Sequence, residues 1–118
     1  GAVHSMSHAA GANQDLRLHH GTLNGVILPT ILRFNMNHVG DKYSRISRAM
    51  GKDESTDLAN EIEKLNEKIG LPSGLAEMGI TEDMIPGLVA HSMTDPSNMT
   101  TPRLPSQEEW EKLFLEAM

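Results

Sequence analysis

The chain has 118 residues, a formal net charge of −6 and no cysteine. This length supports one domain, and the excess of carboxylates argues against a nucleic-acid partner, which requires clustered basic side chains. The lack of cysteine excludes disulfides and thiolate metal sites and suits a cytoplasmic protein, and no apolar run is long enough to predict a membrane span.

The hydrophobic pattern of the first 50 residues predicts helices, because no segment shows the alternation that is typical of strands. A first helix is expected over 2–14. The most apolar helix is expected over 21–37, with a kink or a break at Pro29, which removes a helical donor. A third helix is expected over 41–50, with Asp41 as its N-cap.

The clearest helical periodicity in the chain lies over 56–69. Ser55 is expected to cap the start of this helix, and Gly70 is expected to end it. Its apolar residues recur at helical spacing and are therefore expected to form one buried face. These residues are Leu58, Ile62, Leu65 and Ile69.

The pattern after residue 70 predicts shorter elements. A single turn of helix is expected over 71–79, followed by a helix over 82–93 with Thr81 as its N-cap. The three prolines within 94–105 predict a loop.

The last helix is expected over 107–117. Ser106 and Glu109 have the spacing of a capping box, in which each residue bonds the backbone of the other. This helix should bury Trp110, Leu113 and Phe114. The chain is therefore predicted to be an all-α bundle of about seven helices within a single domain, 1–118.

Histidine is concentrated at the start of the chain. His4 and His8 are spaced four residues apart, so they share one helix face, and a helical hairpin would return His19 and His20 to them. Grouped imidazoles bind Zn²⁺, Fe²⁺, Ni²⁺ or Cu²⁺, although such histidines also occur as helix caps or solvated side chains. The isolated histidines are expected at the surface or in packing, and these are His38 and His91.

No other catalytic arrangement stands out. The nearest carboxylate in the sequence is that of Asp15, which is interpreted as a helix cap rather than a ligand. Neither a Ser/His/Asp order nor a glycine-rich phosphate loop is recognisable.

The two histidine segments, GAVHSMSHAAGA and HHGTLNGVILPTILRFN, together resemble the C-terminal half of iron-containing (group III) alcohol dehydrogenases. The resemblance extends to Pro102-Arg103 and the acidic last helix, and so covers nearly the whole chain. The matching positions in the two segments are Gly1, His4, His8, Gly11, His20-Gly21, Asn24, Leu28-Pro29 and Phe34-Asn35.

The resemblance implies a Rossmann-like domain that binds NAD or NADP, followed by an all-α domain of the dehydroquinate synthase-like type. A catalytic Fe²⁺, or sometimes Zn²⁺, would lie between them, held by one Asp and three His. Two of those ligands match His4 and His20. His8 matches a catalytic and cofactor-binding histidine near the nicotinamide and the substrate. His19 stands where proline is common, so a shift in register would make it the ligand, but the His-Gly match favours His20.

By this resemblance, the chain is expected to be the C-terminal metal-binding part of a larger, homo-oligomeric alcohol or aldehyde oxidoreductase, without the N-terminal NAD(P)-binding domain. The chain alone is then expected to be inactive. Two alternatives are a stand-alone helical module that binds metal through histidines, and an inert helical interaction fragment. Substrate, choice of NAD or NADP and metal identity stay open at this point.

Overall fold

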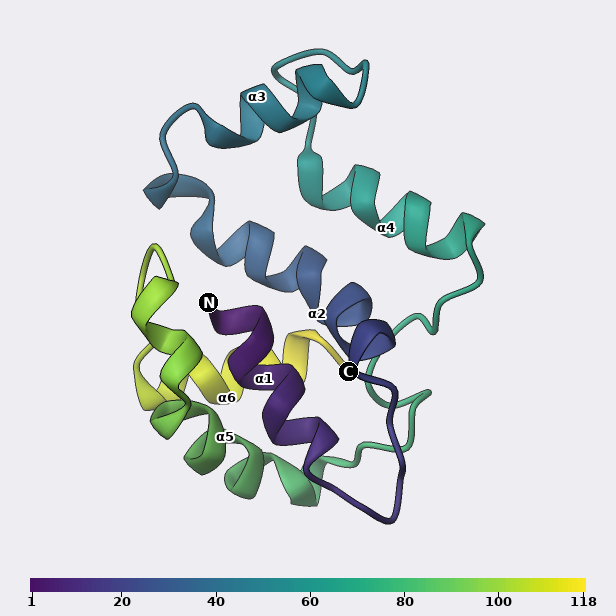
Figure 1. Ribbon diagram of the computed structural model, residues 1–118, viewed down its shortest axis with the longest axis vertical. Coiled ribbons are helices and arrows are strands. Elements are labelled where there is room, and N and C mark those ends of the chain that lie inside the picture. Colours follow the sequence, from purple (N-terminus) through teal and green to yellow (C-terminus); the bar gives the residue numbers. More distant parts are fainter.

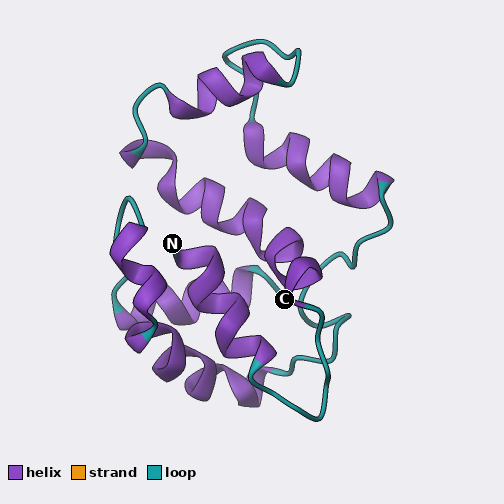
Figure 2. Ribbon diagram, in the orientation of Figure 1, coloured by secondary structure: helices purple, strands orange, loops and turns teal.

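The computed structural model describes all 118 residues and contains helices and loops without any strand (Figure 2). The all-α prediction is confirmed. The expected count of about seven helices is replaced by six α-helices and three short 3-10 helices. The α-helices are α1 (Ala2–Gly11), α2 (His20–Asn35), α3 (Lys42–Ala49), α4 (Leu58–Lys68), α5 (Ile85–Thr94) and α6 (Gln107–Glu116). The 3-10 helices are η1 (Met36–His38), η2 (Glu82–Met84) and η3 (Pro96–Thr100).

The hydrophobic core lies between α1, α2, α5 and α6. In Figure 1, α1 lies with α2 on one side and with α5 and α6 on the other. Small residues on α1 let its neighbours approach closely, and Met6 fills the space between them with no exposed surface. The predicted burial of the last helix is confirmed, since each of the three residues expected to be buried is at most 3% exposed: Trp110, Leu113 and Phe114.

The pair α3 and α4 lies outside this core, at the top of Figure 1. The sequence predicts that the apolar stripe of α4 is buried along its length, but Leu58 is the only residue of the stripe that is fully buried. Leu65 is 44% exposed and Ile69 is 60% exposed. The prediction is wrong at these residues because α4 packs against α2 without a further layer to cover the rest of the stripe.

Two helix starts differ from the prediction. Helix α4 is capped by Asp57, whose carboxylate accepts a hydrogen bond from the Asn60 amide at 3.1 Å. Ser55 instead bonds Asp53, so it is not the cap. Asp41 precedes α3 but makes no side-chain capping bond. In each case backbone conformation at the turn decides which oxygen reaches the free amides.

The two prolines that lie within expected helices have different effects. Helix α2 continues through Pro29 without a break and ends at Asn35, two residues earlier than expected. The predicted helix over 82–93 is divided, because Pro86 lies in the first α-helical turn and the α-helix begins only at Ile85. Thr81 precedes the 3-10 turn without making a capping bond.

The remaining differences are local. The first helix ends at Gly11 rather than at 14, and 71–79 forms turns rather than a helix. The loop over 94–105 contains η3. The capping box of α6 is confirmed, since Ser106 Oγ accepts from the Glu109 amide and the Glu109 carboxylate accepts from the Ser106 amide. None of the helices is both long and apolar enough to span a membrane.

Candidate functional site: three histidines on two helices

Helices α1 and α2 bring three imidazoles together. His4 and His8 lie one turn apart on α1, with ring centroids separated by 5.6 Å. His20, the first residue of α2, places its ring centroid 5.3 Å from that of His4 and 5.3 Å from that of His8. The loop between the two helices therefore returns the chain as the sequence pattern predicted.

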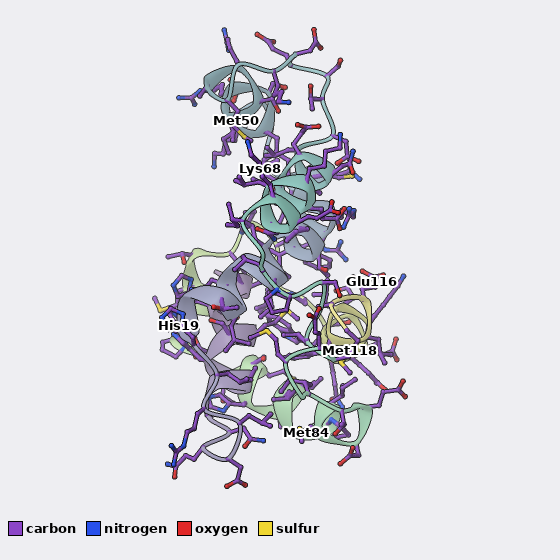
Figure 3. The ribbon with its side chains drawn as sticks, turned by 90° about the vertical axis from the view of Figure 1, so that its right-hand side faces the viewer. His19, Met50, Lys68, Met84, Glu116 and Met118 are labelled. Carbon is purple, nitrogen blue, oxygen red and sulfur yellow. The ribbon has the colours of Figure 1, made fainter.

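The neighbouring His19 has a different place. It is the N-cap of α2, and its Nδ1 accepts a hydrogen bond from the Thr22 amide at 3.3 Å. Figure 3 labels it at the edge of the molecule where α2 begins. The geometry thus groups His20, and not His19, with His4 and His8. His38 and His91 are exposed and lie outside the group, as expected.

The His20 ring lies between neutral partners. Ser7 Oγ is 3.5 Å from its Nδ1, and the Asn24 amide nitrogen is 3.0 Å from its Nε2. The Asn24 side-chain oxygen is buried and has no hydrogen-bond partner. Asn24 was part of the family resemblance, and its position one helical turn after His20 explains the contact.

His8 has a charged partner, Asp95, that is distant from it in the sequence. Its Nδ1 lies 2.9 Å from Oδ2 of Asp95, whose side chain is 6% exposed against 40% for His8. Burial alone would raise the pKa of Asp95, but hydrogen bonds from the Ser97 amide and from His8 outweigh it and lower that pKa to about 2. Asp15, the nearest carboxylate in the sequence, is exposed and does not reach the imidazoles.

The sequence carried only a partial signal for Asp95. An aspartate immediately before a proline predicts a helix start, and Asp95 does cap η3 by accepting from the Ser97 amide at 2.8 Å. That signal accounts for the hydrogen bond of one carboxylate oxygen, Oδ1. The contact with His8 joins residues 87 positions apart, which a local pattern cannot show.

His4 is the least constrained of the three. Its side chain is exposed and makes no hydrogen bond. Partial desolvation of the ring lowers its pKa, and the positive charges that His20, the N-terminus and His8 can carry lower it further. The ring is therefore held towards its neutral form, which is the form that binds metals.

The spacing of the imidazoles is compatible with a shared metal. Two imidazoles that share a tetrahedral metal at about 2.1 Å have ring centres roughly 5 Å apart, and both His4 and His8 have ring centres 5.3 Å from that of His20. No group of three His, Cys, Asp or Glu side chains within the chain is placed to hold a metal ion.

A groove of about 460 Å³ adjoins His4 between α1 and α2. Its walls are mostly apolar and include Val3, Leu28 and Tyr43. Asn35 also lines it, and the side-chain oxygen of Asn35 is buried without a partner. A groove of this size and character suits a small organic molecule or part of a larger one.

The chain matches the Fe-containing alcohol dehydrogenase family, C-terminal, over residues 1–118. It belongs to that family. It is 38% identical to 4-hydroxybutyrate dehydrogenase of Cupriavidus necator over 125 residues, covering 100% of this chain and 33% of that protein. It is 31% identical to lactaldehyde reductase of Escherichia coli K12 over 122 residues, covering 97% of this chain and 31% of that protein.

Two solved structures show the same fold. A 1,3-propanediol oxidoreductase superposes with a TM-score of 0.92 at 27% identity, covering 100% of this chain and 32% of that one. The iron-containing alcohol dehydrogenase of Thermococcus thioreducens superposes with a TM-score of 0.84 at 30% identity, covering 99% of this chain and 31% of that one. The chain thus spans about a third of the length of the relatives that it matches.

Proposed function

We propose that this chain is the C-terminal helical domain of a metal-dependent, NAD(P)-linked alcohol dehydrogenase that interconverts small alcohols and aldehydes. The observation that carries the proposal is the convergence of His4, His8 and His20, at the positions of the family resemblance, on one face of α1 and α2. In this proposal His4 and His20 bind the metal, and His8 is the catalytic histidine beside the nicotinamide.

The metal, Fe²⁺ or Zn²⁺, would supply Lewis-acid chemistry that lowers the pKa of the alcohol. His4 and His20 contribute two neutral imidazole nitrogens, and the lowered pKa of His4 favours that state. His8 would accept or donate a proton near the nicotinamide. The groove beside His4 offers apolar walls for the carbon chain of the substrate.

The site is proposed to be completed by an N-terminal domain that contributes the remaining ligands and binds NAD or NADP. Two observations support a shared site: the imidazoles are partly or largely exposed, and the chain has no third metal ligand in place. The second observation also argues against a stand-alone module that binds metal through its own residues. The whole enzyme is proposed to be a homo-oligomer.

A chimera tests this proposal. The chain would replace the C-terminal third of 4-hydroxybutyrate dehydrogenase from Cupriavidus necator, its 38% identical relative. The chimera should produce NAD(P)H from an alcohol only when loaded with metal, whereas the purified chain alone should produce none.

His4→Ala and His20→Ala should each abolish the activity of the chimera and weaken its metal binding, because each removes one ligand. His38→Ala is the matched control, since His38 is exposed and lies in η1, after the opposite end of α2 from His20. Activity that survives both ligand substitutions, or NAD(P)H production by the chain alone, would contradict the proposal.

A further inference from the structure

The carboxylate of Asp95 is buried directly beneath an imidazole of the site. Its Oδ2 lies 2.9 Å from Nδ1 of His8, while its Oδ1 accepts from the Ser97 amide at 2.8 Å. Both oxygens are therefore engaged, and only 6% of the side chain is exposed. A buried carboxylate with two hydrogen bonds of this kind is held in its ionised form.

The charge of Asp95 determines which atom of His8 carries the proton. An ionised carboxylate can only accept hydrogen bonds, so Nδ1–H of His8 must be the donor. In the neutral imidazole, Nε2 then has no proton and presents a lone pair. Because Nδ1 is occupied, Nε2 is the only ring nitrogen that His8 can offer to a ligand.

A series of hydrogen bonds connects α1 to the residues on either side of Asp95. Ser5 Oγ donates to Asn98 Oδ1 at 2.7 Å, and the Asn98 amide donates to the Ser92 carbonyl at 2.8 Å. Ser92 Oγ in turn donates to the Ser5 carbonyl at 3.2 Å. Ser5 and Ser92 have no exposed surface. The turn of α1 before His8 is thus attached to the segment that carries Asp95, which sets their separation.

The three imidazoles differ in their partners. His20 lies beside Ser7 and Asn24, which are neutral, and His4 has no side-chain partner. Only His8 has a carboxylate partner. Such a carboxylate orients an imidazole and stabilises the positive charge that the ring gains when it takes up a proton.

We propose that Asp95 is a positioning residue that holds His8 in its Nδ1-protonated tautomer, with Nε2 as the acceptor at the active site. The proposal rests on the proposed function only for what Nε2 faces, namely the substrate and the nicotinamide. During proton transfer, Nε2 takes the proton of a hydroxyl group, and the resulting imidazolium remains paired with Asp95.

The tautomer is directly measurable in the full chain by ¹⁵N NMR of its histidine side chains, at a pH where the imidazoles are neutral. His8 should show a protonated Nδ1 and an unprotonated Nε2. The exposed His38 serves as an internal reference, because a free imidazole favours the opposite tautomer. A His8 ring protonated mainly at Nε2 would overturn the proposal without any variant being made.

Asp95→Asn should convert His8 from the Nδ1-protonated form to a mixture, because the amide can donate to Nδ1 as well as accept from it. Asp15→Asn, which alters an exposed carboxylate outside the group, is the matched control and should leave the tautomer unchanged. A variant that melts at a lower temperature but keeps the His8 tautomer would assign Asp95 a purely structural role and reject the proposal.

Steady-state kinetics test the positioning role of Asp95 independently. In the complete enzyme, Asp95→Asn should lower kcat by about 10- to 100-fold and change KM for the alcohol little, as expected for loss of a partner that orients a catalytic imidazole. An unchanged kcat would count against the positioning role. If the complete enzyme has no dehydrogenase activity at all, the proposed function fails, while the NMR result still decides the tautomer.

Discussion

Asp95 shows at the level of one residue how burial and hydrogen bonding compete. Burial opposes its charge, yet two donors reverse the balance and lower its pKa to about 2 from an ordinary 3.8. Because the folded state holds the carboxylate ionised, the stabilisation is fully present above the ordinary pKa. It is lost as the pH falls from about 4 through about 2.

The first prediction is that Asp95→Asn lowers the free energy of unfolding by about 2 kcal/mol at pH 6, and that this difference shrinks towards pH 2. Urea denaturation of both proteins across this pH range measures it. Asp15→Asn, at an exposed position, should show no comparable pH dependence. A difference for Asp95→Asn that stays constant with pH would mean that its ionisation is not linked to folding.

At the scale of elements, the end of α6 is held by a contact with residues 74–76 that the sequence did not predict. The Leu75 amide donates to the Ala117 carbonyl at 2.8 Å, and the Ala76 amide donates to the Met118 carbonyl at 3.2 Å. Gly74 allows this close approach, because a Cβ there would lie 2.1 Å from the main-chain oxygen of Met118. Met118 and the nearby Glu116 are labelled in Figure 3.

The prediction for this element is that Gly74→Ala destabilises the protein by about 1–3 kcal/mol, because the backbone of the chain end must move away. Gly87→Ala is the control. Gly87 lies in α5 with nothing within 4 Å of the added Cβ, so this change should be neutral or stabilise by up to about 1 kcal/mol. Thermal unfolding of both variants compares them, and equal melting temperatures would show that the chain end does not contribute.

The whole molecule is elongated, with extents of 41 × 30 × 19 Å, and its core is concentrated at one end. Every residue of the main core cluster comes from outside α3 and α4. In Figures 1 and 3 these two helices occupy the end of the molecule that is farthest from α5. Helices α3 and α4 therefore have fewer buried apolar contacts that keep them folded against the rest of the molecule.

At this scale we expect backbone amides of α3 and α4 to exchange with deuterium faster than those of α1, α2 and α6. The reason is that the outer pair can open without exposing the core around Trp110 and Met6. Hydrogen exchange followed by mass spectrometry resolves the two regions. Uniform protection across all helices would indicate that the chain unfolds only as a single unit.

Much of this architecture could be predicted from local sequence patterns. The capping box at Ser106 and the apolar spacing of the last helix identified α6 and its buried face, because both depend on residues within a few positions of each other. The same reasoning failed for the stripe on α4. Periodicity identifies which residues share a face, but it does not show whether another element covers that face as far as Ile69.

By itself, the sequence determined that the chain is helical, and its family motifs singled out His4, His8 and His20. Only the tertiary structure separated His20 from His19 and placed Asp95 against His8. The physical reason is the sequence separation over which each interaction acts. Helix spacing and capping act over one turn, whereas the partner of an imidazole is selected by packing that joins α1 to the segment after α5.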